Sequence, residues 1–145
     1  MRKMTMKTKF ATALFLTLAA PAFAGEAITV YRDPGCGCCN TYIDYLKTNG
    51  FAVTTIDDSK FADRAIAAGV PEKGLGCHLA MIDGYAVSGL VPVEIINRLI
   101  TDKPDIKGIT LPGMPMNAPG MADAKTGTLK VYAFAPAGIT VYSEE

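Results

Sequence analysis

The sequence predicts a mixed α/β domain in which short strands and helices alternate, preceded by an export signal. Three observations support this prediction. Short runs of β-branched and aromatic residues alternate with runs whose apolar residues recur at helical spacing. Clusters of glycine and proline separate these runs. The first residues of the chain are basic and are followed by an apolar run. The roughly 120 residues after the signal are enough for one domain with a modest core.

The N-terminal segment, residues 1–24, has the composition of a secretory signal peptide. Four basic residues precede an apolar run over residues 10–20, and residues 22–24 (Ala-Phe-Ala) form the small-x-small pattern that signal peptidase accepts. The apolar run is shorter than the ~20 residues of a transmembrane helix, which argues against a membrane anchor. We therefore expect cleavage before Gly25 and a soluble periplasmic chain, residues 25–145, with no membrane span.

The charge of this mature chain excludes one class of partner. The signal contains four of the 14 basic residues and none of the 14 acidic residues, so its removal leaves a formal charge of −4 and no basic stripe. Proteins that bind DNA or RNA neutralise phosphates with clustered Lys and Arg. We therefore do not expect a nucleic acid as a partner.

The first half of the mature chain predicts a strand, a helix, a second strand and a second helix. Residues 27–32 form a β-branched and aromatic run that stops at the turn Asp33-Pro34-Gly35. From Cys39, apolar residues recur at helical spacing until Asn49-Gly50, and residues 51–56 predict the second strand. Residues 57–59 then offer N-cap candidates for a short helix that ends at Gly69.

The second half predicts a hairpin and a third helix. A strand over residues 78–82 meets Asp83-Gly84, which is typical of a hairpin turn, and a partner strand over residues 85–88. A helix follows with Pro92 in its first turn and continues to Ile100. The order β-α-β-α-β-β-α is that of a thioredoxin-like fold, a four-stranded mixed sheet with helices on its faces.

The C-terminal third differs in character. Residues 111–121 contain three prolines and two glycines, too many for a helix or a central strand, and predict a loop rich in Met and Pro. Residues 129–134 and 139–142 alternate around Pro136-Ala137-Gly138 and predict a terminal β-hairpin. This hairpin is expected either to extend an edge of the sheet or to fold over the cysteines at the first strand-helix turn.

Four cysteines, Cys36, Cys38, Cys39 and Cys77, follow the signal, and the only histidine, His78, adjoins the last of them. Two structural disulfides, with three connectivities, are one explanation in an exported protein. This explanation fits poorly, because closing the tiny loops between the first three cysteines would remove little entropy from the unfolded chain.

Cys36 and Cys39 form a Cys-x-x-Cys pair at the start of a predicted helix, where the helix dipole and free N–H groups lower a thiol pKa to between ~3.5 and ~7.5. A thiolate is both the nucleophile of disulfide exchange and the soft ligand that selects Cu(I). An oxidoreductase needs two sulfurs, and Cys38 beside Cys39 would invite mispairing. A metal site gains from every additional sulfur, so the cluster favours metal binding.

The spacing favours copper over zinc. Structural zinc usually uses two separated Cys-x₂₋₄-Cys pairs, whereas three sulfurs here fall within four residues. Because we expect the side chains of Cys38 and Cys39 to diverge, several Cu(I) ions bridged by thiolates fit better than one tetrahedral ion. Cys77 and His78 begin the third strand and can complete the site, provided that the backbone is irregular at Gly76, since strand neighbours point to opposite faces.

The only histidine and three methionines are further candidate copper ligands, and each has a second interpretation. His78 is either a solvated or core histidine or, because it follows a candidate ligand directly, a ligand itself. Met114, Met116 and Met121 offer thioethers suited to Cu(I), as ligands or as a transfer site, or they form a lid that shields the cluster.

Three segments resemble the CopG-type family of periplasmic copper-binding proteins: residues 29–39 (TVYRDPGCGCC), 76–78 (GCH) and 113–121 (GMPMNAPGM). The resemblance covers nearly all of residues 27–135. It implies a thioredoxin-like fold, bound copper, a role in copper resistance and Cu(I)/Cu(II) interconversion. By position, it implies that the four cysteines are ligands and that His78 is the family's cysteine-adjacent histidine.

We therefore expect a periplasmic protein that holds Cu(I), as a polynuclear thiolate cluster, and that sequesters, relays or changes the oxidation state of copper. The sequence leaves open whether the chain turns over as an enzyme. The alternatives are a thiol-disulfide oxidoreductase, with Cys36 as nucleophile and Cys39 as resolving thiol, and a zinc-stabilised binding domain. The expected partners are periplasmic proteins that donate or accept copper.

Overall fold

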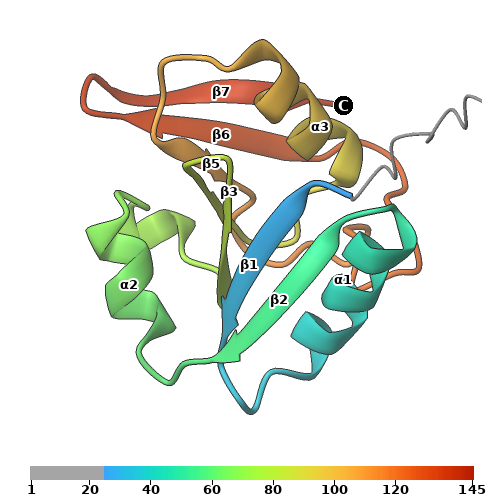
Figure 1. The fold of residues 1–145 in the computed structure, drawn as a ribbon. Helices are drawn as coiled ribbons and strands as arrows, with labels where there is room; N and C mark the ends of the chain where they lie inside the picture. Colours follow the sequence, from blue (N-terminus) through green and yellow to red (C-terminus); the bar gives the residue numbers. More distant parts are fainter. Residues whose placement is uncertain (1–24) are drawn as a thin grey trace, which may run out of the picture.

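Residues 25–145, which the computed structural model describes, form one mixed sheet of seven strands with three α-helices packed on it (Figure 1). The strand order is β2-β1-β3-β4-β5-β6-β7. The elements of the first half are β1 Ala27–Arg32, α1 Gly37–Thr48, β2 Ala52–Asp57, α2 Phe61–Ala67, the 3₁₀ helix η1 Glu72–Gly74, β3 His78–Ile82 and β4 Tyr85–Ser88. Those of the second half are α3 Val93–Asp102, β5 Gly108–Thr110, β6 Lys130–Ala135 and β7 Gly138–Glu144.

The first seven predicted elements are all present. The predicted strands over residues 27–32, 78–82 and 85–88 have the observed bounds, and Asp83 and Gly84 both have positive φ (46° and 83°), as the predicted hairpin turn requires. Strand β1 pairs in parallel with β2 and antiparallel with β3. This pairing brings the end of β1, where α1 begins, beside the start of β3.

Two helix starts differ from the prediction. Lys60, not a residue of 57–59, is the N-cap of α2, because the Asp58 carboxylate instead accepts a hydrogen bond from the Lys60 N–H (2.9 Å) and pairs with Arg64 (2.8 Å). Pro92 is the N-cap of α3 and has extended backbone, so it precedes the first turn.

Three more strands extend the predicted four-stranded sheet, and two of them, β6 and β7, belong to the predicted terminal hairpin. Strand β5, which no pattern predicted, pairs in parallel with β4 and antiparallel with β6. The predicted terminal hairpin is confirmed as β6–β7, with bounds close to those predicted. Through β5 it extends the edge of the sheet and does not fold over the cysteines.

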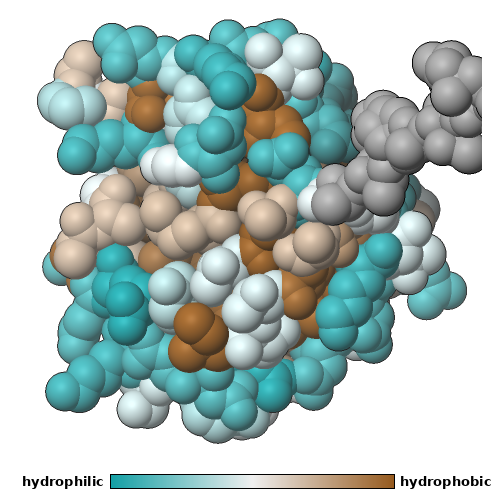
Figure 2. All heavy atoms as spheres, in the orientation of Figure 1, coloured by the Kyte–Doolittle hydropathy of each residue, from teal (hydrophilic) through white to brown (hydrophobic). Residues whose placement is uncertain are grey.

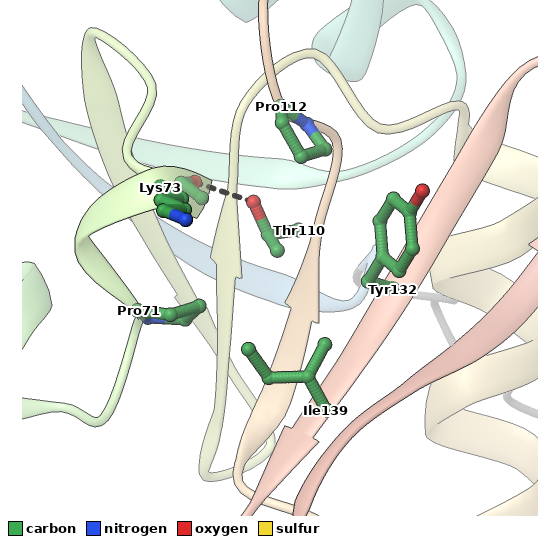
Figure 3. A pocket seen from close by; sticks show the side chains of 7 residues that line it. Pro71, Lys73, Thr110, Pro112, Tyr132 and Ile139 are labelled. Carbon is green, nitrogen blue, oxygen red and sulfur yellow. Dashed lines mark hydrogen bonds between the residues drawn. The ribbon is translucent and has the colours of Figure 1, made fainter.

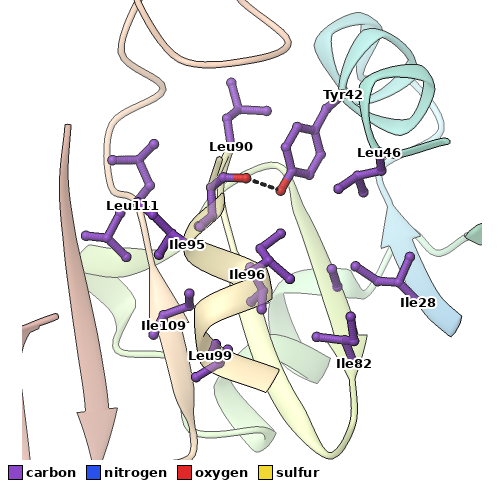
Figure 4. Close-up of a cluster of buried hydrophobic side chains, with 14 of the residues drawn as sticks. Ile28, Tyr42, Leu46, Ile82, Leu90, Ile95, Ile96, Leu99, Ile109 and Leu111 are labelled. Atoms are coloured by element: carbon purple, nitrogen blue, oxygen red, sulfur yellow. Dashed lines mark hydrogen bonds between the residues drawn. The ribbon is translucent and has the colours of Figure 1, made fainter. Parts of the chain in front are cut away.

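The two faces of the sheet bury separate clusters. Helices α1 and α3 cover one face with Tyr42, Leu46, Ile95, Ile96 and Leu99, which pack on Ile28, Val30, Ile82, Val87 and Ile109 from the strands (Figure 4). On the other face Ala65 of α2 packs with Leu79 and Phe134. Each fully buried Leu or Ile side chain stabilises the fold by about 1.5–3 kcal/mol, so the larger cluster fixes α1 firmly against β1 and β3.

On the molecular face shown in Figure 2, hydrophilic residues cover the upper and lower parts, and a band of mildly to strongly hydrophobic residues crosses between them. In the part of the chain that the structure describes, no helix is long and apolar enough to cross a membrane. The predicted signal peptide, residues 1–24, lies outside the described residues.

Candidate metal centre

The turn Asp33-Pro34-Gly35 positions the first cysteine. The Asp33 carboxylate accepts a hydrogen bond from the Gly35 N–H (2.7 Å), and the Asp33 carbonyl accepts one from the Cys36 N–H (3.1 Å). Such a turn reverses the chain at the end of β1 and leaves Cys36 as the N-cap of α1. The Asp33 N–H also donates to the Cys77 carbonyl (3.4 Å), which ties this turn to the start of β3.

The sulfurs of the four cysteines form one group, with every Sγ within 4.8 Å of the others. A disulfide joins Cys36 to Cys39, and Cys38 and Cys77 are free thiols. The Cys38 Sγ lies 3.1 Å from the Cys36 Sγ and 3.3 Å from the Cys77 Sγ, and the Cys77 Sγ lies 3.3 Å from the Cys39 Sγ. The sulfurs therefore close a ring in the order Cys36, Cys39, Cys77, Cys38.

The expectation that Cys38 and Cys39 diverge was wrong. Both sulfurs lie 3.3 Å from the Cys77 Sγ. In the first turn of a helix, Cα–Cβ bonds tilt toward the N-terminus, so both side chains lean toward the end of α1 that Cys77 faces. After reduction, the sulfurs need to separate only to the roughly 3.8 Å edges of a tetrahedron with metal–sulfur bonds of ~2.3 Å to surround a single ion. The convergent sulfurs can therefore surround a single metal ion as well as bridge several ions.

His78 completes the buried side of the centre. Its Nδ1 lies 3.8 Å from the Cys39 Sγ and 4.0 Å from the Cys77 Sγ, so it approaches two of the four sulfurs. The side chain is fully buried, and its Nε2 has no hydrogen-bond partner among the described residues. Burial lowers the pKa of His78 to about 4, so the imidazole is neutral at neutral pH, the form that binds metal ions.

The predicted irregular backbone before the third strand is present at Cys77, which lies in a bend just before β3 begins at His78. A Cβ at Gly76 would lie 2.8 Å from the backbone N and Cα of Gly89, so no larger residue fits without movement. The Gly76 N–H donates to the Ser88 hydroxyl (3.1 Å), which itself donates to the Gly74 carbonyl (3.1 Å). This anchored segment lets Cys77, just before β3, and His78, its first residue, both approach the Cys39 sulfur, at 3.3 Å and 3.8 Å.

The pKa of the Cys77 thiol is shifted in the opposite direction to that of a thiol at the start of a helix. Burial and the hydrogen bond with Cys38 raise the pKa of Cys77 to about 12. At neutral pH this thiol keeps its proton. Metal binding at Cys77 must therefore displace a proton, because the thiolate is the ligand.

The Met/Pro loop lies against the centre, but its three methionines differ in environment. Met114 and Met121 are partly buried against the larger core cluster, whereas Met116 is 73% exposed. A Cβ at Gly120 would lie 3.4 Å from the Cys38 carbonyl oxygen. The loop therefore packs beside the first turn of α1, as a lid would, and its exposed thioether is Met116.

Tyr42, one of the apolar residues that recur at helical spacing after Cys39, also packs against the metal centre. Its ring lies 4.9 Å from the His78 ring, and its hydroxyl donates to the Val91 carbonyl (2.7 Å). Residues three apart share a helix face, so the spacing from Cys39 was the available signal. The contact of Tyr42 with His78 depends on how α1 packs on β3, and no pattern in the sequence predicts that packing.

A separate groove of about 220 Å³ lies between η1, β5 and the terminal hairpin (Figure 3). Its lining includes Pro71, Thr110, Pro112, Tyr132 and Ile139, and none of the cysteines. This groove is therefore distinct from the metal centre.

The fold and the centre define a mixed α/β protein with a four-cysteine, histidine-flanked site of the kind that can hold soft metal ions. Residues 75–121, which include Cys77, His78 and the Met/Pro loop, match the family described as "Protein of unknown function, DUF411". A comparison with curated proteins found no match.

Two solved structures, "Copper resistance protein copG" in form 1 and form 2, are similar to the chain over most of its length. Each is 35% identical, with a TM-score of 0.75, over 83% of this chain and 98% of the other. The chain belongs to the CopG family of copper resistance proteins. This membership, together with the four-cysteine group, supports a copper-related role.

Proposed function

We propose that this chain is a periplasmic copper-binding protein of thioredoxin-like architecture that holds Cu(I) at Cys36, Cys38, Cys39, Cys77 and His78 and acts in copper resistance. The observation that carries the proposal is the group of four sulfurs within 4.8 Å of one another, with the His78 Nδ1 3.8 Å from one of them. Soft thiolates select Cu(I), and imidazole also suits copper.

We propose further that the site holds several ions in one cluster. A tetrahedral ion uses four donors, whereas this centre offers four thiols and an imidazole once the disulfide is reduced. Thiolates can bridge Cu(I) ions, and the 3.1–3.3 Å separations in the sulfur ring place each sulfur beside two others. Copper held in this way is sequestered, relayed or changed in oxidation state.

The Met/Pro loop supports a role in copper transfer. Because Met116 is exposed while the loop packs beside Cys38, its thioether can meet copper that arrives from or leaves for another periplasmic protein. Met114 and Met121, which pack on the core, serve as the lid.

A second candidate function rests on the Cys36–Cys39 disulfide. Cys39 is fully buried, whereas Cys36 is partly exposed, which is the arrangement of a nucleophile and its resolving thiol. Reduction of insulin disulfides tests this function. We expect little activity from the wild-type chain, and robust turnover that Cys36→Ser abolishes would favour an oxidoreductase over the copper proposal.

Anaerobic titration of the reduced protein with Cu(I), followed by elemental analysis, tests the proposed function. We expect more than one Cu(I) per chain and no displacement by Zn(II). A variant with all four cysteines replaced by serine is the control and should bind none tightly. A stoichiometry of one ion, or displacement of copper by zinc, would contradict the cluster.

A further inference from the structure

We propose that a protein dithiol opens the Cys36–Cys39 disulfide by attack on Cys36, and that this reaction controls copper loading. The inference rests on the proposed function, because it concerns access of copper to the same four sulfurs. It assigns the chain a partner of defined chemistry: a protein that carries two vicinal thiols.

The disulfide withdraws half of the sulfur donors. With Cys36 and Cys39 joined, only Cys38 and Cys77 remain as thiols, 3.3 Å apart. A disulfide sulfur has no thiolate charge to offer a metal ion. The oxidised chain therefore lacks the ligands for the full copper load, and two electrons must enter before loading.

The difference in burial between Cys36 and Cys39 determines which of the two sulfurs a partner's thiolate can attack. Cys39 has 0% exposure, whereas Cys36 is partly exposed at the start of α1. Pro34, Gly35 and Gly37 around it are exposed, and a Cβ at Gly37 would meet no atom within 4 Å. An attacking protein can therefore bring its backbone close to Cys36 without meeting a side chain at Gly37.

The chemistry requires a dithiol. The partner's thiolate attacks the Cys36 Sγ, a partner–Cys36 disulfide forms, the Cys36–Cys39 bond breaks, and Cys39 leaves as a thiolate that takes up a proton. A monothiol would stop here, because Cys39, three residues away, has a high effective concentration for the reverse attack. The second thiol of a dithiol instead attacks the partner's own sulfur and releases Cys36. The chain gains two electrons and two protons, and the partner becomes a disulfide.

Trapping tests the point of attack. A thioredoxin whose resolving cysteine is replaced by serine is mixed with the oxidised protein, and the adduct is mapped by non-reducing peptide mass spectrometry. We expect a mixed disulfide at Cys36. The Cys38→Ser variant serves as a second target, because the Cys38 Sγ, 3.1 Å from the Cys36 Sγ, can displace the trapped thioredoxin. Linkage to Cys39, or no adduct with either target, would overturn the proposal.

Kinetics test whether the partner docks as a protein. Gly37→Phe should slow reduction by intact thioredoxin about tenfold, equivalent to ~1.4 kcal/mol, and leave reduction by dithiothreitol unchanged. Thr48→Phe, at the exposed far end of the same helix, is the matched control and should slow neither. Equal rates for Gly37→Phe and wild type with thioredoxin would overturn docking at this surface.

Copper uptake separates this inference from the proposed function. Cu(I) stoichiometry is measured for the oxidised protein and for the protein reduced with a phosphine. We expect full uptake only after reduction. Equal, high uptake in both states would overturn the redox control, whereas low uptake in the reduced state would instead reject the proposed function.

Discussion

The Tyr42 ring lies 4.9 Å from the His78 ring and holds it against the sulfurs of the metal centre. Both side chains are fully buried, and the Tyr42 hydroxyl is anchored on the Val91 carbonyl at 2.7 Å. Helix α1 thus supplies Cys38 and Cys39 to the centre and, one turn later, the ring that packs on its imidazole. The donors and their support are parts of one packed unit.

Removal of the Tyr42 hydroxyl should destabilise this unit. Tyr42→Phe leaves the buried Val91 carbonyl without its donor, which costs about 1–3 kcal/mol in the free energy of unfolding. Urea denaturation of the metal-free protein measures the loss. Tyr45→Phe is the control, because the Tyr45 hydroxyl is only partly buried and accepts a hydrogen bond from the Val93 N–H (3.1 Å). Equal stability of wild type and Tyr42→Phe would show that this anchor contributes nothing.

Acid should destabilise the metal-free protein through His78. Burial lowers the pKa of His78 to about 4, below the ~6.5 of an exposed histidine, so the unfolded chain binds more protons between these values. Stability that is present above pH 6.5 is lost as the pH falls toward 4, by up to roughly 3 kcal/mol.

Urea midpoints measured between pH 7 and 4.5 test this dependence. His78→Gln, which does not titrate, should show a flatter profile over the same range. The carboxyls of Asp58 and Glu145, whose pKa values Arg64 and Arg98 lower, contribute equally in both proteins, so the difference between the two profiles isolates His78. The same slope in both proteins would rule out His78 as the source.

A side chain at Gly76 should disturb both stability and copper binding. In Gly76→Ala, the added Cβ meets the Gly89 backbone at 2.8 Å, and such overpacking costs about 1–3 kcal/mol. Because Gly76 positions Cys77, the Cu(I) stoichiometry should also fall. Gly37→Ala, where nothing lies within 4 Å, is the matched control and should retain both properties. Normal copper binding by Gly76→Ala would mean that this close approach does not position Cys77.

Copper uptake at Cys77 should release a proton. Burial and the neighbouring Cys38 raise the pKa of Cys77 to about 12, so at pH 7 the thiol is protonated until the metal displaces the proton. An indicator dye in weak buffer measures the protons released as Cu(I) binds to the reduced protein. Cys77→Ser should release fewer protons per chain. Equal release by the two proteins would exclude Cys77 as a ligand.

The sequence predicted the elements whose pattern is local. Residues 27–32 and the Asp83-Gly84 hairpin have clear strand and turn chemistry, and they are found where the patterns placed them. The clustering of Cys36, Cys38 and Cys39 was evident from spacing alone. An irregular backbone beside Gly76 was also predicted, and Cys77 lies in a bend there. The close approach of Gly89 explains why position 76 is a glycine.

The features that the sequence did not predict depend on tertiary packing. Strand β5 has only three residues and begins with a glycine, so it has no measurable alternation, and its pairing with β4 and β6 defines it. The convergence of Cys38 and Cys39 depends on Cys77, which comes from another element. The shifted pKa of His78 arises from its burial, which spacing in the sequence cannot reveal.

X-ray absorption at the copper K-edge of the Cu(I)-loaded, reduced protein tests the central claim most directly. The proposed centre predicts a first shell dominated by sulfur, scattering from a neighbouring copper ion, and loss of both in the variant with all four cysteines replaced by serine. A first shell of nitrogen and oxygen only, or a sulfur shell that this variant retains, would contradict copper binding at the four cysteines.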